Sequence, residues 1–583
     1  MIGETGVGKS TFINALANYC TYDSLPDAVK DGGSFPIQST FTVTDPQTKT
    51  QIVISSEGKL LPGTQITKVG ESVTQKPNEY VFMHGHIAIN LIDTPGLLDT
   101  HDAGTSAHDT DKQNVDNILK LLSQYEEIHA IFILIKANEN RLKETFQYTL
   151  TEIFKRLDKS ACNNVIFIFT NARSTNFKTD SAQPILQQFL NDKNLSIDLP
   201  PKKPTIYCFE NDTVQYLAEC KNKIPHEEEE VDDAQKSWNK SVKTTDKLLG
   251  YFSSLKPHSL AAINSIYKAT STVSMVSKLL LENIMCIFEE VSEMDKKKNE
   301  AERLKEEITS NPRNFAKGEL YSLLHMTETK VVYKQLDHTN VVCESSACAK
   351  VEGDCIIYPQ ICCRACKVDG FIMWYCSQMT WLGVCKACRC VKSEHRFRTT
   401  ETIITKKLYE PDLAVIDEIV NSNDALRQLN EGISEFENRV KQLENETEQM
   451  IETCAKLNAF AHQHALVETS SADYELLKCL ENQRQTYMKA GSLNACRKAS
   501  HLANIKERYQ QHLARAKHYR YSVDDVPKLI EQLHRLPRKG PDIKQAMDAE
   551  ENARHKVIED VKKTKKIYEF KFGSHFSINL GLL

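Results

Sequence analysis

The sequence predicts an α/β fold with a doubly wound parallel sheet in its N-terminal part, followed by long α-helices and a small cysteine-rich module. Three observations carry this prediction. A glycine-rich loop occupies residues 3–10, apolar segments typical of buried strands follow it, and ten of the 18 cysteines lie between Cys343 and Cys390. A chain of 583 residues should hold several domains.

The glycine-rich loop fits the phosphate-binding pattern G-x-x-x-x-G-K-[ST]. Its backbone N–H groups would surround nucleotide phosphates, Lys9 would reach the β- and γ-phosphates, and Ser10 would hold Mg²⁺. The helix that follows would direct its N-terminus at the phosphates. The predicted nucleotide-binding residues of this loop are Gly3, Glu4, Thr5, Gly6, Val7, Gly8, Lys9, Ser10 and Thr11.

A second motif supports the first. The apolar segment 87–92 predicts a strand that ends in Asp93-Thr94-Pro95-Gly96. A carboxylate at this place lies beside Mg²⁺, and the N–H of Gly96 would face a γ-phosphate. The alternative is an ordinary Pro-Gly turn. We therefore expect Lys9, Ser10, Asp93 and Gly96 to be catalytic residues, with Ser10 and Asp93 as Mg²⁺ ligands.

Further apolar segments complete the predicted sheet: strands over 128–135, 164–170 and 205–209, and a helix over 141–157. The loop after 164–170 is Thr170-Asn171-Ala172-Arg173, where GTPases usually carry [NT]-K-x-D. An arginine replaces the base-reading carboxylate, so the motif does not separate GTP from ATP. Asn171 and Glu210 are the base-contacting candidates, and a plain polar loop is the alternative for 210–212.

Two departures qualify this prediction. Leu97 stands where many small GTPases place a water-orienting glutamine, so hydrolysis should be slow unless another group supplies that function. A parallel sheet also needs a central strand before Gly3, and only Met1 and Ile2 precede it. We therefore expect the first strand to be largely missing and a longer reading frame to supply it.

Residues 3–15 and 92–96 together resemble the septin and immunity-associated (GIMAP-type) branch of P-loop GTPases. More closely, the chain resembles a group of animal G domain-containing proteins that share Phe-Thr-Asn-Ala-Arg (169–173), a cysteine-rich segment and long coiled-coil helices. This resemblance covers most of the chain. It implies a GTP-binding activity with Mg²⁺.

The cysteine-rich segment has the spacing of zinc ligands, with short C-x₂-C pairs separated by loops. Disulfides and unligated thiols are the alternatives, and disulfides would need an oxidising compartment. We expect a structural role for the metal. The candidate zinc ligands are Cys385, Cys388, Cys390 and His395, with Cys343, Cys348, Cys363 and Cys366 as further partners whose pairing the sequence leaves open.

Long helices flank this segment. Apolar residues from Leu426 to Leu457 step by three and four without a break, which predicts a coiled coil, and Leu280 to Met294 step in the same way. The seam would be buried in an antiparallel arm with the cysteine module near its tip, in a parallel homodimer, or against a globular core. The acidic run 227–233 is interpreted as a solvated loop. The basic run 562–566 is interpreted as a solvated helix face, with a contact to acidic lipid or nucleic acid as the alternative.

Composition excludes several classes of protein. The formal net charge of −5 gives no general attraction to nucleic acid, and no apolar run predicts a transmembrane segment. We expect a cytoplasmic, slow GTPase that acts as a switch or scaffold and binds itself or other proteins through its coiled coil. The alternative is a helical scaffold with a degenerate nucleotide domain. The expected domains are 1–225 (nucleotide-binding), 226–335 (helical), 336–400 (zinc module), 401–465 (coiled coil) and 466–583 (charged, helical).

Overall fold

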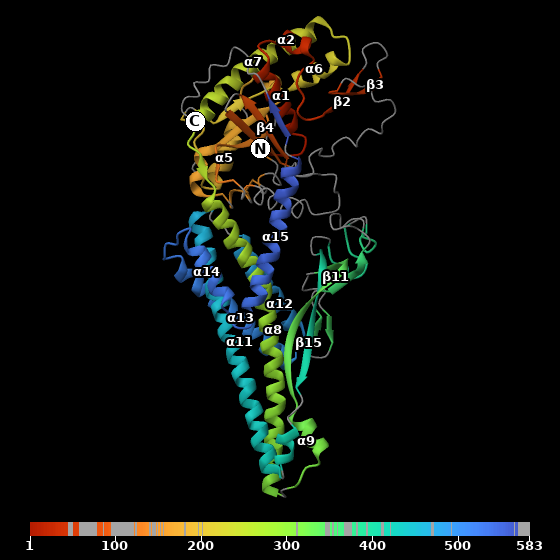
Figure 1. The fold of residues 1–583 in the computed structure, drawn as a ribbon, viewed down its shortest axis with the longest axis vertical. Coiled ribbons are helices and arrows are strands. Elements are labelled where there is room, and N and C mark those ends of the chain that lie inside the picture. Colours follow the sequence, from red (N-terminus) through yellow and green to blue (C-terminus); the bar gives the residue numbers. More distant parts are fainter. Residues whose placement is uncertain are drawn as a thin grey trace. The chain divides into compact units, whose positions relative to one another are not determined.

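The structure is a computed structural model, and it divides the chain into two compact units (Figure 1). The first comprises Met1–Tyr267, His464–Thr469 and Glu550–Leu583, and the second comprises Lys268–Gln463 and Ser470–Ala549. The described residues are 1–44, 50–57, 78–84, 87–94, 122, 125–138, 142, 147, 150–151, 153–155, 157–179, 182–195, 197–200, 202–310, 313–343, 350–352, 355–357, 360–366, 376–380, 383–391, 395–409, 413–419, 421–467, 471–490, 492–564 and 566–569.

The first unit contains the predicted parallel sheet. Its strands lie in the order β1 (Ile2–Gly3), β7 (Ile131–Lys136), β8 (Val165–Thr170) and β9 (Ile206–Cys208), and every neighbouring pair is parallel. The expected strand 128–135 is divided: β6 (Glu127–Ile128) pairs instead with β10 (His258–Ser259). Strand β1 pairs through two residues, Ile2 and Gly3.

A second sheet of the first unit contains the strand that precedes Asp93. Strand β5 (Ile87–Asp93) is antiparallel to β4 (Asn78–His84), and β16 (Lys566–Glu569) adds to the other edge of β4 in parallel. The backbone N of Met1 donates to the Ile92 carbonyl at 2.8 Å, so β5 lies next to β1. The region 466–583, expected to be helical, therefore also contributes a strand. Strands β2 (Thr40–Thr44) and β3 (Gln51–Ser55) form a separate antiparallel pair.

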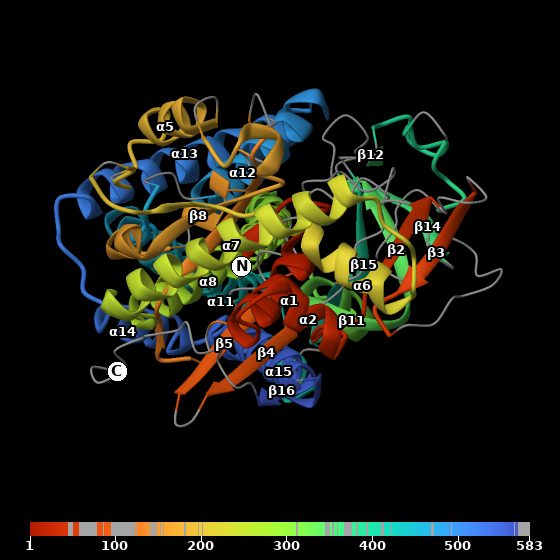
Figure 2. The ribbon, with the colours of Figure 1, turned by 90° about the horizontal axis from the view of Figure 1, so that it is seen from above.

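Helices cover both faces of the parallel sheet, as a doubly wound fold requires. Alternate residues of β8 enter two separate cores: Phe167 packs in one with α5 (Ala182–Asp192), and Ile168 packs in the other with α1 (Lys9–Thr21) and α7 (Glu228–Ser254). Figure 2 shows α1 and α7 close together. The remaining described α-helices of this region are α2 (Leu25–Asp31) and α6 (Asp212–Lys221), with 3₁₀ turns at Lys159–Asn164 and Arg173–Thr175.

The acidic run 227–233 was expected to be a solvated loop, and the structure corrects this. Glu227 caps α7, and its backbone N donates to a side-chain oxygen of Glu230 at 2.9 Å. The following acidic residues occupy the first turn of the helix. Carboxylates are favoured there because the N-terminus of a helix carries a partial positive charge. The run therefore starts a helix.

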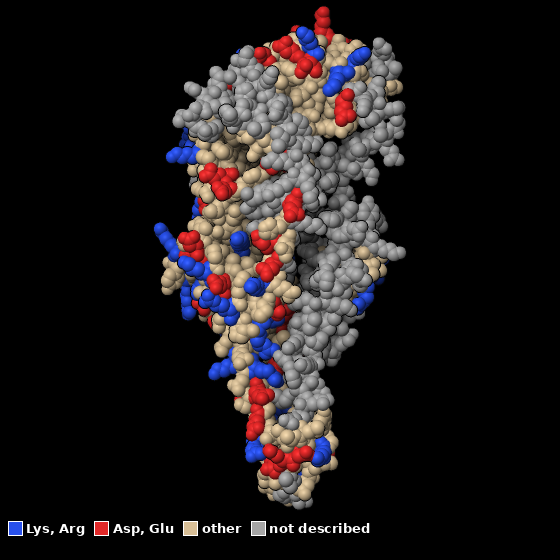
Figure 3. Space-filling model, in the orientation of Figure 1, with Lys and Arg blue, Asp and Glu red and all other residues tan. Residues whose placement is uncertain are grey.

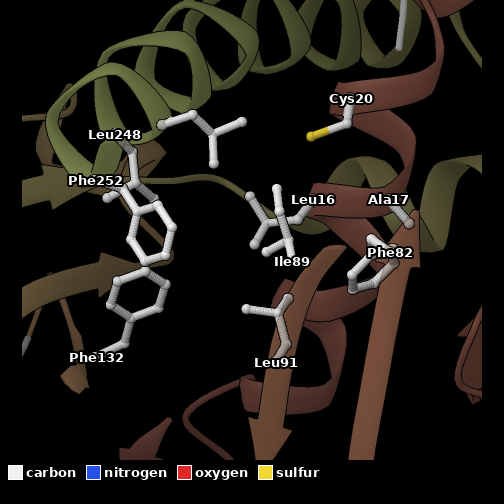
Figure 4. Close-up of a pocket in the computed structure, with 10 residues that line it drawn as sticks. Leu16, Ala17, Cys20, Phe82, Ile89, Leu91, Phe132, Leu248 and Phe252 are labelled. Carbon is white, nitrogen blue, oxygen red and sulfur yellow. The ribbon is translucent and has the colours of Figure 1, made fainter. Parts of the chain in front are cut away.

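An apolar pocket lies between α1, α7 and strands β4, β5 and β7 (Figure 4). It encloses about 530 Å³ of space, part of which is open to solvent. Cys20 is the only lining residue with a titratable group, and burial raises the pKa of its thiol, so the thiol stays protonated. This pocket offers no group that would bind a phosphate.

The second unit is built on two long helices that run antiparallel, α8 (Ala261–Ser310) and α11 (Ser422–His464) (Figure 1). Asn283 donates to the Leu443 carbonyl and the Thr447 hydroxyl, both at 3.0 Å, and further along Ala301 and Leu304 share a core with Leu429. The predicted seam of α11 is thus buried against a helix of the same chain, and we name this α8–α11 pair the arm.

Helix α8 is also the one described helix that is long and apolar enough to cross a membrane by composition. Its most apolar 18-residue window has a mean hydropathy of 1.3, and 71% of that window is buried within the structure. Burial of this kind is expected of a helix that packs in a protein core. It is weak evidence for a membrane span.

Between the helices of the arm the chain forms a β ribbon that the sequence analysis did not predict. Strands β11 (Met326–Cys343) and β15 (His395–Tyr409) are antiparallel, and β14 (Gln360–Cys366) pairs with the end of β11. Strands β12 (Lys350–Glu352) and β13 (Cys355–Ile357) form a short pair. The described helices that complete the fold are α9 (Lys317–Leu324), α10 (Leu413–Glu418), α12 (Ser471–Ala490), α13 (Leu493–Ala516), α14 (Asp525–His534) and α15 (Gly540–Thr564).

Charge is mixed on the face of the molecule that Figure 3 shows. Lysine and arginine side chains are interspersed there with aspartate and glutamate side chains. The exposed pair of Lys298 and Glu437 on the arm, 2.9 Å apart, is one example. Charge that is interspersed in this way gives no strong local attraction to nucleic acid.

Candidate nucleotide-binding site

The phosphate loop joins β1 to α1 and has the backbone conformation that its glycines permit. Gly6 and Gly8 have φ of 75° and 92°, in the left-handed region that favours glycine, and Gly8 precedes the first residue of α1. Gly3 is required for a different reason, because a Cβ there would lie 2.9 Å from the Leu134 carbonyl oxygen. The two left-handed glycines form the turn that leads into the N-terminus of α1, and the backbone N–H groups at a helix N-terminus can bind phosphate.

Lys9 is buried at the first residue of α1. Its ammonium group donates to the carbonyl oxygens of Gly3 at 2.9 Å and Glu4 at 3.1 Å. Both acceptors are neutral, and a phosphate oxygen would be a stronger, charged acceptor for the same group. The loop thus keeps a preoriented cation at the position where the sequence predicts phosphates.

The structure brings together the two predicted Mg²⁺ ligands, although they are far apart in the sequence. The Ser10 hydroxyl donates to a carboxylate oxygen of Asp93 at 2.9 Å, and Asp93 is fully buried at the end of β5. The Thr94 hydroxyl donates to the Met1 carbonyl at 2.6 Å, which holds the residue after Asp93 beside the start of the chain. A hydroxyl beside a carboxylate is an all-oxygen donor set of the kind Mg²⁺ prefers. Gly96 and Leu97 lie outside the described residues.

Two asparagines of α1 fix the segment that leads to β2. The Asn14 amide donates to the Ile37 carbonyl at 2.8 Å and accepts from the Ile37 backbone N at 2.9 Å, and Asn18 makes the same pair of bonds with Ser34. The segment 34–37 is thereby held against the helix that carries the phosphate loop. Thr40, the first residue of β2, is exposed.

The base-reading loop is tied to the phosphate loop. The buried Thr170 hydroxyl donates to the Val7 carbonyl at 2.8 Å, and Asn171 follows with an exposed side chain and a φ of 55°. The carboxylate of Glu210 accepts from the Arg173 backbone N at 2.8 Å. Both predicted base-contacting residues therefore lie at this loop, with Glu210 engaged in holding its backbone.

Arg173, which occupies the position of the base-reading carboxylate of GTPases, is paired with acidic side chains. Its guanidinium pairs with Asp212 at 2.8 Å and lies 3.8 Å from Asp233. Burial, followed by the nearby Glu210 carboxylate, raises the pKa of Asp212 to about 6, and Arg173 opposes this shift. Asp212 belongs to the segment 210–212, which the sequence offers either as a source of a base-contacting carboxylate or amide or as a plain polar loop. Its pairing with Arg173 depends on the tertiary fold.

The raised pKa of Asp212 predicts a pH effect on stability. The unfolded aspartate has a pKa of about 4, so between roughly pH 4 and 6 the folded state binds more protons, and stability falls as pH rises through this range. We expect Asp212→Asn to flatten that part of the profile of unfolding free energy against pH. Asp233→Asn, at an exposed partner of the same arginine, is the matched control. Equal slopes in wild type and Asp212→Asn would contradict the assignment.

The comparisons with known proteins agree with this geometry. Residues 64–201 match the AIG1 family. A stretch of 158 residues is 26% identical to Septation protein 7 of Candida albicans, covering 26% of this chain and 21% of that protein. The match thus spans about a fifth of the relative's length. These matches confirm the expected resemblance of the N-terminal domain to septin and GIMAP-type G domains. Together with the phosphate loop, the resemblance supports the conclusion that the chain is a GTP-binding protein.

Among solved structures, a dimerization-deficient mutant of Toc33 from Arabidopsis thaliana is similar to part of the chain. It is 15% identical, and the match covers 38% of this chain and 82% of that one, with a TM-score of 0.23.

The cysteine module brings predicted and unpredicted ligands together. Cys385, Cys388 and His395 converge with Cys362, which the sequence analysis had left out of its favoured set. Cys363 and Cys366 converge with Cys376, also outside that set. Cys390 lies instead near Cys343 and Cys388. Cys348 lies outside the described residues. The module can hold a metal, and the strand pairings, which the sequence does not reveal, decide which side chains meet.

Proposed function

We propose that this protein binds Mg²⁺-GTP at the phosphate loop and hydrolyses it slowly. The observation that carries the proposal is the convergence of Lys9, Ser10 and Asp93 around a loop with two left-handed glycines. Lys9 would bind the β- and γ-phosphates, and Ser10 and Asp93 would hold Mg²⁺. The backbone N–H groups of residues 4–11 would donate hydrogen bonds to the phosphate oxygens. Bound Mg²⁺ supplies neutralisation of the charge that develops on the phosphates.

We assign the helical region a scaffold role. The arm pairs α8 with α11 within one chain, so its solvent-exposed residues are available to other proteins or to further copies of the chain. The state of the nucleotide domain would act on such partners. The cysteine module would hold structural Zn²⁺, because thiol and imidazole groups gather there in the combination that structural zinc sites use. Zinc-binding thiols of this kind suit a reducing, cytoplasmic environment.

One observation favours a second candidate function. Arg173 is neutralised by Asp212 at the place where a guanine-reading carboxylate is expected, so base selectivity would be weak. In this alternative the domain binds nucleotide without effective hydrolysis, and the chain acts mainly as a helical scaffold.

Competition and turnover measurements separate the two candidates. Displacement of a fluorescent GTP analogue by GTP and by ATP gives the base selectivity, and single-turnover assays give the rate. For the slow GTPase we expect preferential displacement by GTP and a rate on the order of 10⁻³ per second, as in G domains without a supplied catalytic group. Equal displacement by ATP with no measurable turnover would favour the scaffold. Fast hydrolysis by the isolated monomer would contradict both.

A further inference from the structure

The candidate metal ligands of the cysteine module form three groups among the described residues. The atoms that would bind a metal in Cys362, Cys385, Cys388 and His395 all lie within 4.8 Å of one another, and so do those of Cys363, Cys366 and Cys376. Cys343, Cys388 and Cys390 meet the same limit, but this group shares Cys388 with the four-ligand group. We name the two groups that share no ligand the first set, with His395, and the second set, with Cys376. In a tetrahedral zinc site with bonds of about 2.3 Å, neighbouring ligand atoms are roughly 3.8 Å apart. Both sets are therefore close enough to close on an ion with small side-chain movements. None of the described cysteines forms a disulfide.

The first set is built on a turn that suits a metal. The Cys385 backbone N donates to the Cys390 carbonyl at 2.9 Å, and the Arg389 N donates to the Cys385 carbonyl at 2.9 Å. Arg389 has a φ of 66°, a left-handed conformation that costs energy for a side chain as large as arginine. The strained turn folds Cys388 back onto Cys385, which is what two ligands of one ion require.

His395 is oriented as a ligand. Its Nδ1 lies 3.0 Å from the Val391 carbonyl oxygen, and its Nε2 lies 3.1 Å from the Cys388 sulfur. A carbonyl oxygen only accepts, so Nδ1 carries the proton and Nε2 presents its lone pair toward the thiols. Metal-bound histidines are typically held by such a bond from the other ring nitrogen. The imidazole is buried, with 2% of its surface exposed.

The second set is built on a similar turn. Cys363 and Cys366 are separated by two residues, and Ala365, between them, has a φ of 46° and is held by its N–H, which donates to the Asn340 side chain at 2.9 Å. Cys376 is buried in a short turn in which the Met379 N donates to its carbonyl at 2.8 Å. Three thiols therefore meet at this second position.

Cys362 and Cys363 are adjacent in β14, at an irregularity in its pairing with β11. Val341 pairs with Cys363 and Val342 pairs with Ile361, so Cys362 is the additional residue of a β-bulge. A bulge locally redirects the side chains of its strand, and the two adjacent sulfur atoms here belong to different sets. The two sets are also linked through the hairpin in which Met379 bridges to Cys385.

We propose that this module binds two zinc ions whose ligands interleave along the chain. Cys362, Cys385, Cys388 and His395 form a complete Cys₃His site, and Cys363, Cys366 and Cys376 form the protein part of a second site. This deepens the proposed zinc-binding function and rests on it. Binding releases the thiol protons to solvent and needs no change of oxidation state. Since the two sites fix β14 and the hairpin at 376–391, the metals would hold the end of the ribbon together.

Zinc analysis of single-cysteine variants tests the assignment on the full chain, purified under reducing conditions. We expect two zinc ions per chain in wild type, and loss of one in Cys362→Ser and of one in Cys363→Ser. Cys390→Ser should keep both, although Cys390 lies near Cys343 and Cys388. Cys496→Ser, at an exposed cysteine outside the module, is the matched control and should keep both.

A second measurement identifies His395 even if a serine variant unfolds. In the cobalt-substituted protein, His395→Cys should retain both metals and shift the visible absorption as one more thiolate binds. An unchanged spectrum, retention of both zinc ions in Cys362→Ser, or loss of one in Cys390→Ser would overturn the ligand assignment while leaving zinc binding intact. Wild type with one zinc would remove the second site. Wild type without zinc, with disulfides found instead, would overturn zinc binding itself.

Discussion

Lys9→Ala should weaken GTP binding by roughly 100-fold, about 2.7 kcal/mol, because it removes the buried cation at the phosphate loop. In the structure this buried ammonium group donates to the carbonyl oxygens of Gly3 and Glu4, which orient it at the loop before nucleotide binds. The measurement is an equilibrium titration with a fluorescent GTP analogue in the presence of Mg²⁺.

Lys30→Ala is the control for this substitution. Lys30 is exposed in the last turn of α2, so its removal lowers the net charge by the same amount without touching the loop. The control should bind GTP as wild type does, and thermal melting should show that Lys9→Ala remains folded. Equal affinity in wild type and Lys9→Ala would remove the phosphate-loop assignment.

Arg439→Met should destabilise the second unit by about 3 kcal/mol, because it removes the charged partner of a carboxylate that is buried in the arm. Arg439 donates to Glu290 at 3.1 Å, Glu290 is 1% exposed, and the guanidinium also covers the Phe436 ring at 4.4 Å. Methionine preserves much of the side-chain volume, so the loss reports mainly on the ion pair. Denaturant unfolding followed by helical circular dichroism measures it.

Lys298→Met is the matched control, since it makes the same kind of change in an exposed pair on the same helices. Lys298 and Glu437 are 43% and 54% exposed, and breaking such a pair changes stability by about 0.5 kcal/mol or less. The arm also pairs α8 with α11 of one chain, so the unfolding midpoint should not vary with protein concentration. A midpoint that rises with concentration would indicate a seam shared between chains.

Local patterns were enough to predict the parallel sheet and the phosphate loop. Strands β7 and β8 are continuous apolar runs, as strands covered on both faces are, and the glycine spacing of the loop is specific. The heptad seam likewise predicted the buried face of α11. The heptad pattern did not predict which helix packs against this face, because a parallel dimer and an antiparallel arm bury the same residues.

The features that were missed depend on contacts between distant segments. Strand β16 joins β4 across nearly the whole chain, and no local pattern identifies such a partner. Strands β11 and β15 could have been predicted in part, since both segments are rich in β-branched residues. Parts of both segments were instead assigned to the helical regions that flank the cysteine module. Two functional residues were missed for the same reason. Cys362 meets the other candidate zinc ligands only because of strand pairing, and Asp212 pairs with Arg173 only in the folded chain.

Hydrogen exchange at the phosphate loop tests the central claim most directly. The backbone N–H groups of residues 4–11 would bind the phosphates, so adding Mg²⁺-GTP should slow their exchange, and the same nucleotide should leave Lys9→Ala unchanged. Peptides from the arm provide an internal reference. Protection confined to residues 4–11 and to the segment at Asp93 is the result this account predicts. Unchanged exchange of the loop at saturating nucleotide would contradict it.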